Sequence, residues 1–132
     1  MAIGHFLAFL FSIMVIANTL SFIFRSKEVT RDVIYAAMAA YLLMALMWTF
    51  LYIFLELIQP ASFNVSLDLE QRYQLVFLYY SFVTITTLGY GDVTPVTEIA
   101  RSISVLEAVV GQLYLVVIVA WLVGKYVPSK NR

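Results

Sequence analysis

The chain has no cysteine, which excludes disulfide bonds and thiolate metal sites. His5 is its only histidine, and we interpret it as an incidental residue at a membrane interface. The pairings needed for hydrolysis or acyl transfer are therefore absent, and we expect neither an enzyme nor a bound enzyme cofactor. Charged residues are only 12% of the chain and the formal net charge is zero, which gives no reason to expect a nucleic-acid partner.

Most of the chain is apolar. Apolar residues make up 63% of the 132 residues, and the mean hydropathy of +0.92 is typical of an integral membrane protein. The length predicts one domain. At about 1.5 Å per helical residue, three apolar runs are long enough to cross a hydrocarbon core of about 30 Å, namely residues 3–24, 33–58 and 98–126.

The first run has two other interpretations. A signal peptide would carry basic residues before its apolar run, and this chain has none there. A helix lying on the membrane surface is the second alternative. We favour a membrane helix, and the absence of spaced arginines excludes a voltage sensor.

Residues 72–86 also look helical, but they cover only roughly 20 Å and are too short to span. A short polar segment with two glycines follows them. Irregular backbone is tolerated at membrane depth only where protein or water surrounds it. The pattern therefore predicts a re-entrant helix that runs inward, followed by a segment that runs back out.

That polar segment suits the binding of a dehydrated cation. Gly89 and Gly91 can adopt positive φ without a Cβ clash. A backbone that alternates its handedness at each residue can turn successive carbonyl oxygens to one side, where they replace the water around an ion. Thr87 adds a hydroxyl at the inner end. Because one chain supplies only one wall of such a tube, we expect several copies to meet around an axis.

The run Thr87-Leu88-Gly89-Tyr90-Gly91-Asp92 resembles the selectivity filter of potassium channels, whose usual form is Thr-Val-Gly-Tyr-Gly. The resemblance implies an all-α membrane protein that assembles as a homotetramer in the lipid bilayer. Each chain would supply an outer helix, a re-entrant pore helix with its filter, and an inner helix. The N-terminal helix has no counterpart in two-helix channels, and we expect it at the lipid-facing periphery. The implied potassium ligands are Thr87, Leu88, Gly89, Tyr90 and Gly91, with K⁺ as the transported ion.

The resemblance also implies a set of residues that support the filter. Tyr79 and Tyr80 stand where many channels carry two tryptophans that brace it, and we expect Tyr80 to offer its hydroxyl to Asp92 or Tyr90. Val83 stands where some bacterial channels have a glutamate paired with the acid after the filter. Without that glutamate we expect weaker inactivation of the filter.

Two residues of the last run have a possible gating role. Gly111 lies twenty residues after Gly91, where relatives place a hinge glycine, with close helix packing as the alternative. Glu107 lies one turn earlier, and an ionisable group inside a membrane is usually functional. We expect it to point toward Ser81 or Thr84 as a gating carboxylate, or else to lie near the outer interface.

One face of the same helix is predicted to line the pore. Helical spacing places four residues on that face, and the resemblance implies that it lines the cavity below the filter. Three of them would form an apolar neck that gates by dewetting. The four residues are Gln112, Leu115, Val119 and Val123.

Lysine and arginine predict the orientation in the cell membrane. A cytoplasmic linker places six basic residues inside and only Arg72 and Arg101 outside, so the N-terminus is external and the C-terminus cytoplasmic. The expected division is a membrane helix (1–24), a cytoplasmic linker (25–32), a pore domain (33–127) and a short cytoplasmic tail (128–132). Two alternatives to a potassium channel stay open: a weakly selective cation channel, in which the filter tyrosine is usually lost, and a non-conducting regulatory subunit.

Overall fold

The computed structural model describes residues 2–65 and 73–129 of the chain. Three of the helices in this part of the chain are long and apolar enough to cross a membrane, which confirms the three predicted spans and an all-α membrane fold. In order, the elements are α1 (Ala2–Arg25), α2 (Arg31–Ile58), β1 (Phe63–Val65), α3 (Tyr73–Ile85), β2 (Val93–Pro95) and α4 (Glu98–Ser129).

Local signals explain where the long helices begin and end. Thr30 caps α2 by accepting a hydrogen bond from the backbone N–H of Val33, and Asp32 lies in the first turn, where the helix dipole favours a negative charge. The last helix continues to Ser129, past its predicted end at residue 126. Pro128 therefore lies in the final turn, and the part of the predicted tail at 130–132 lies outside the described residues.

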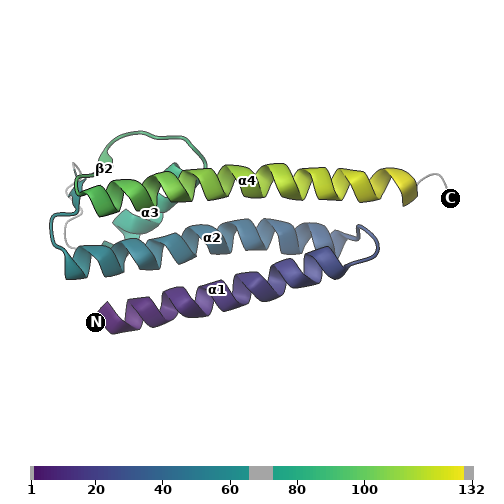
Figure 1. The fold of residues 1–132 in the computed structure, drawn as a ribbon, viewed down its shortest axis with the longest axis horizontal. Helices are drawn as coiled ribbons and strands as arrows, with labels where there is room; N and C mark the ends of the chain where they lie inside the picture. Colours follow the sequence, from purple (N-terminus) through teal and green to yellow (C-terminus); the bar gives the residue numbers. More distant parts are fainter. Residues whose placement is uncertain (1, 66–72, 130–132) are drawn as a thin grey trace.

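The long helices lie side by side, with α2 between α1 and α4 (Figure 1). The short helix α3 lies at the end where α4 begins and packs against both α2 and α4. The loop that follows α3 arches away from the helices before it reaches β2 (Figure 1). Since β1 and β2 pair antiparallel, the segment before α3 is tied to the segment after the loop. This is the re-entrant geometry that the short apolar helix predicts.

An aromatic cluster fixes α3 to α2. Tyr52 of α2 is fully buried, and its ring meets the rings of Phe63 and Tyr80 edge to face, with centroids 5.4 and 5.0 Å apart. Phe77 of α3 meets Phe63 in the same way at 5.0 Å. Such pairs contribute about 0.5–1.5 kcal/mol each beyond the burial of their area. The cluster therefore gives the short helix a rigid backing.

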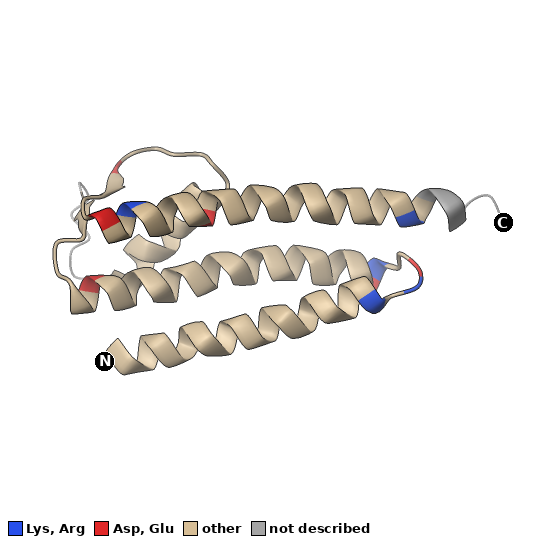
Figure 2. Ribbon diagram, viewed as in Figure 1, with Lys and Arg blue, Asp and Glu red and all other residues tan. Residues whose placement is uncertain are grey.

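Most charged residues lie toward the two ends of the molecule, and the buried Glu107 of α4 is an exception (Figure 2). One end holds more basic than acidic groups, and the other holds more acidic groups. By the bounds of the elements and the contact of Lys125 with Ser26, the first end carries Arg25, Lys27, Arg31 and Lys125 beside Glu28 and Asp32, and the second carries Glu56, Asp92 and Glu98 beside Arg101. The predicted external residues Asp68, Glu70 and Arg72 and the predicted internal residues Lys130 and Arg132 lie outside the described residues.

Candidate functional site

The candidate ion-binding segment begins directly at the C-terminal end of α3. The backbone N–H of Thr87 donates to the carbonyl of Thr84 at 2.9 Å. The next two N–H groups, of Leu88 and Gly89, both donate to the carbonyl of Val83, at 3.0 and 3.2 Å. These bonds satisfy carbonyls that a helix end would otherwise leave unpaired. They also tie the start of the segment to the pore helix.

Left-handed backbone recurs at every second residue of this segment. The angle φ is 60° at Thr87, 61° at Gly89 and 78° at Gly91, and it is not positive at the residues between them. The sequence predicts this conformation for the two glycines but not for Thr87. A β-branched residue with positive φ is strained, and strain of that kind persists only where the surrounding structure enforces it.

The carbonyl oxygens of residues 87–91 lack hydrogen-bond donors within the part of the chain that the structure describes. The side chains of Leu88 and Tyr90 are 56% and 65% exposed, because the segment arches away from its own helices. Carbonyls without donors on a segment that its own helices do not cover are suited to bind a cation once other copies close around it.

Tyr79 braces the outer end of the segment. Its hydroxyl donates to Oδ2 of Asp92 at 2.6 Å, and its ring lies parallel to that of Tyr90, with an angle of 4° and 6.5 Å between centroids. The hydrogen bond to Asp92, and secondarily burial, raises the pKa of the Tyr79 phenol to about 12. Asp92 thus has a neutral hydrogen-bond donor as its partner, in place of the glutamate whose position Val83 takes.

The prediction that Tyr80 reaches Asp92 or Tyr90 is wrong. The hydroxyl of Tyr80 lies 2.6 Å from Oγ of Ser104 in α4 and is buried. Consecutive residues of a helix point about 100° apart, so only one of two adjacent tyrosines can face the loop. The other joins α3 to α4, which still places both side chains behind the candidate site.

Glu107 is fully buried where α2, α3 and α4 meet. The hydroxyl of Tyr52 donates to its Oε2, and Oγ of Ser81 lies 2.5 Å from its Oε1. The same Oγ lies 2.8 Å from the backbone carbonyl of Ala45. The expected contact with Ser81 is confirmed, and a place at the outer interface is excluded by the burial. Sequence reasoning missed Tyr52, although a tyrosine inside an apolar helix signals a hydroxyl that needs a partner.

Ile85 is a second junction of the same three helices. Tyr41 of α2 donates to the backbone carbonyl of Ile85 at 3.1 Å. A Cβ placed on Gly111 would lie 2.6 Å from Cγ1 of Ile85 and 2.8 Å from its carbonyl oxygen, so only glycine permits this approach of α4. Close packing therefore accounts for Gly111, and its role as a hinge stays a prediction. Tyr41 was not foreseen.

The face of α4 that carries the four predicted pore-lining residues is exposed. Gln112, Leu115, Val119 and Val123 are all exposed, with Val119 and Val123 at 55% and 56%, and Leu115 also borders an apolar groove against α2. The buried residues Glu107, Gly111 and Ile118 lie about 100° away around the helix and face the other helices of the chain. The single chain thus leaves this face, like the carbonyls of residues 87–91, without a covering element among the described residues.

Comparison with known proteins agrees with this architecture. A family model described as ion channel matches residues 28–127, a range that contains α2, the candidate site and most of α4 but not α1. The chain is also similar to Protein LctB of Bacillus caldotenax, with 32% identity over 98 residues that cover 71% of this chain and 72% of that relative. No solved structure matches it.

Proposed function

Since this chain belongs to the ion channel family, of the two-helix potassium-channel type, we propose that four copies form a pore that conducts potassium passively and selectively. The observation that carries the proposal is the left-handed backbone at Thr87, Gly89 and Gly91, together with the carbonyls of residues 87–91, which lack donors among the described residues. A fourfold ring of such carbonyls would replace the hydration shell of K⁺ at successive levels. Repulsion between ions at adjacent levels would then drive conduction without any catalytic step.

The assembly proposed is a homotetramer around an axis beside α4. Its exposed face would line a cavity in which Gln112 is the polar member. Leu115, Val119 and Val123 would form the apolar neck nearer the other end of the helix. The partial negative charge at the C-terminal end of α3 would favour a cation in that cavity.

The proposed orientation places the basic end of the molecule in the cytoplasm (Figure 2). The N-terminus of α1 and the candidate filter then lie on the outer side. Acidic groups at that end, among them Asp92 and Glu98, would raise the local concentration of cations at the mouth of the pore. Salt would screen this effect.

Reversal potentials in proteoliposomes test the proposal. We expect purified protein to pass K⁺ in strong preference to Na⁺ under mixed-ion conditions. Gly91→Ala should reduce current or selectivity, because φ at this position is 78° and an alanine there is strained. Gly4→Ala is the matched control, since Gly4 lies in α1 with nothing within 4 Å of an added Cβ.

Two results would contradict the proposal in different ways. Equal permeability to Na⁺ and K⁺ would identify a weakly selective cation channel. Assembled protein that passes no ion under any pH or voltage would identify a non-conducting subunit.

Glu107 and Val83 carry the proposed regulation. Glu107 joins the inner helix to the pore helix, which is the position from which a carboxyl group would couple gating to the filter. If Glu107→Gln leaves the open probability and its pH dependence unchanged, Glu107 has no gating role.

Val83→Glu should accelerate current decay if the missing carboxylate pair accounts for weak inactivation.

A further inference from the structure

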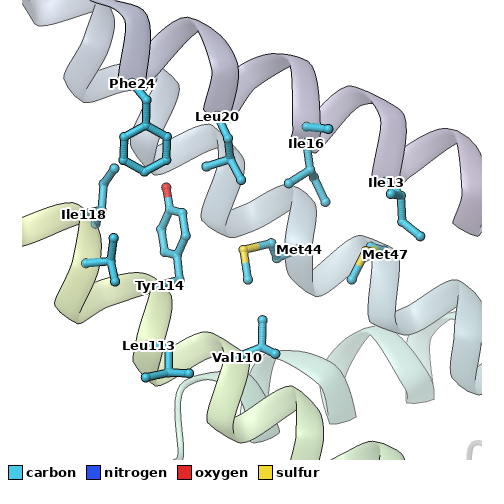
Figure 3. A pocket seen from close by; sticks show the side chains of 12 residues that line it. Ile13, Ile16, Leu20, Phe24, Met44, Met47, Val110, Leu113, Tyr114 and Ile118 are labelled. Carbon is cyan, nitrogen blue, oxygen red and sulfur yellow. The ribbon is translucent and has the colours of Figure 1, made fainter. Parts of the chain in front are cut away.

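An apolar groove of about 490 Å³ lies between α1, α2 and α4 (Figure 3). Ile13, Leu20 and Phe24 of α1 form one side of it, with Met44 of α2 at its base. Tyr114 of α4 contributes one polar atom, but its hydroxyl already donates to the carbonyl of Ala37. The hydroxyl oxygen of Tyr114 is then the one polar side-chain atom of an otherwise apolar lining, which favours a hydrocarbon as the occupant.

The groove is as long as one leaflet of a bilayer. Ile13 and Phe24, at its two ends along α1, are eleven residues apart, which is about 17 Å of helix. Half of a hydrocarbon core of about 30 Å is about 15 Å. The length matches a single acyl chain that starts at the end of α1 where Phe24 lies.

The groove faces away from the proposed pore axis. Val117, which lines it, follows Leu115 by two residues and so points about 200° around the helix from that pore-facing side chain. This step rests on the tetramer proposed above. In that arrangement the groove lies on the bilayer side of α4.

Charge and aromatic contacts mark the end of the groove at Phe24. Trp121 of α4 meets the ring of Phe24 edge to face, with 5.6 Å between centroids. The ammonium group of Lys125 lies 4.4 Å from the centre of the Trp121 ring and also donates to the carbonyl of Ser26. These contacts hold a positive charge beside the mouth of the groove. Arg25 follows Phe24 directly and is exposed.

The charges around this mouth sum to a positive value. The connection between α1 and α2 carries three basic residues, Arg25, Lys27 and Arg31, and two acidic residues, Glu28 and Asp32. Lys125 makes the balance four to two, a net charge of +2. No ion pair joins these groups among the described residues, and Asp32 lies in the first turn of α2, where the helix dipole favours it.

We propose that the groove binds one acyl chain of an anionic phospholipid, whose phosphate-bearing headgroup lies among Arg25, Lys27 and Lys125. The chain length, the almost wholly apolar lining and the net positive mouth each select this ligand. One side of the groove is formed by α1, which the family match does not cover, and the rest by α2 and α4, which it does.

Quenching of Trp121 fluorescence by brominated lipid tests the site directly. Trp48→Phe makes Trp121 the single tryptophan, and it is a mild change because the buried indole N–H of Trp48 has no partner in the described structure. In vesicles of phosphatidylcholine we expect brominated phosphatidylglycerol to quench more strongly than brominated phosphatidylcholine at equal mole fraction. Replacing Arg25 and Lys27 by glutamine should lower the affinity for phosphatidylglycerol relative to phosphatidylcholine. We expect about a fivefold loss for each replacement, because a basic residue near an anionic headgroup contributes about 1 kcal/mol.

A filled groove supplies the second comparison. Ala17→Phe puts a ring into the groove, and quenching by either brominated lipid should fall toward the value for lipid at random contact. Met14→Phe is the matched control, because Met14 is exposed on the same helix and does not line the groove. Photo-crosslinking of the unmodified protein by phosphatidylglycerol with a diazirine chain should label both α1 and α4, and it needs no tryptophan substitution.

Each contrary result overturns the proposal. Equal quenching by the two lipids would exclude an anionic site, and quenching that survives Ala17→Phe would place the chain elsewhere. No quenching by either lipid, with no crosslink to α1, would mean that a neighbouring copy covers the groove. None of these readouts measures ion flux, so they fail or succeed independently of potassium conduction.

Discussion

Replacing Glu107 by glutamine should leave the protein nearly as stable as before, whereas leucine should destabilise it. Glutamine has the same shape, and its carbonyl oxygen can accept the hydroxyl of Tyr52. Its amide group can donate to Ser81, whose hydroxyl has a second acceptor 2.8 Å away at the carbonyl of Ala45. Every polar atom of the junction then keeps a partner, so we expect a change within about 1 kcal/mol.

Leucine breaks this arrangement at one point. Ser81 still donates to Ala45, but the buried hydroxyl of Tyr52 loses its acceptor. A buried polar group left unpaired costs about 1–3 kcal/mol. Tyr52→Phe alone leaves Oε2 of Glu107 without its donor and should cost a similar amount. Combining Glu107→Leu with Tyr52→Phe removes both partners, so the double variant should be more stable than the sum of the two single losses predicts, by a coupling energy of about 2 kcal/mol.

The free energy of unfolding, measured by titration with SDS in mixed micelles, gives all four corners of this cycle. Far-ultraviolet circular dichroism on each variant before titration verifies that the starting helical content is equal. A glutamine variant as unstable as the leucine variant would show that a charge, rather than hydrogen bonding, holds the junction. A double variant as unstable as the sum of its singles would show that Tyr52 and Glu107 are not directly coupled.

Two further perturbations follow from the same contacts. Gly111→Ala should destabilise the protein in the same SDS titration, because the added methyl group meets the Ile85 backbone at 2.8 Å. Overpacking of this kind costs about 1–3 kcal/mol, whereas the gain in helix propensity is about 1 kcal/mol. Gly124→Ala is the control and should be neutral or stabilising, because nothing lies within 4 Å of the added Cβ. Tyr79 has a raised pKa, which favours its neutral form in the folded protein, so its bond to Asp92 should persist fully below pH 10 and be lost as the pH rises through about 12. We expect potassium flux or tetramer stability to fall as the pH rises through this range, and Tyr79→Phe should abolish that fall. A fall of unchanged size in the phenylalanine variant would show that another group causes it.

The long elements follow from the sequence because hydropathy and length alone decide them. Three apolar runs must cross a bilayer and must satisfy their backbone groups as helices. The short run before Thr87 cannot cross, so it must turn back. The two glycines likewise require a local backbone that other residues avoid, and both have positive φ.

The pairing of side chains was harder to predict from the sequence, because it depends on how the helices are rotated relative to each other. Adjacent tyrosines 79 and 80 look equivalent in the sequence, yet one reaches Asp92 and the other Ser104. Tyr41 and Tyr52 are separated from their partners by 44 and 55 residues. No local pattern encodes such distances. Only the demand of a buried hydroxyl for an acceptor points to them, and that demand does not name the acceptor.

The buried contacts of α4 divide into two sets at Gly111. Before Gly111 in the sequence, Ser104 and Glu107 form hydrogen bonds with side chains of α3. Gly111 itself contacts Ile85, which lies two residues before the candidate filter. After Gly111 in the sequence, Ile118 packs against α1 and α2, and Lys125 donates a hydrogen bond to the connection between those two helices. A bend at Gly111 would therefore leave the filter support intact and would strain only the contacts with α1 and α2. Close packing and hinge motion at this glycine are thus compatible, and α1 lies against the half of the helix that would move.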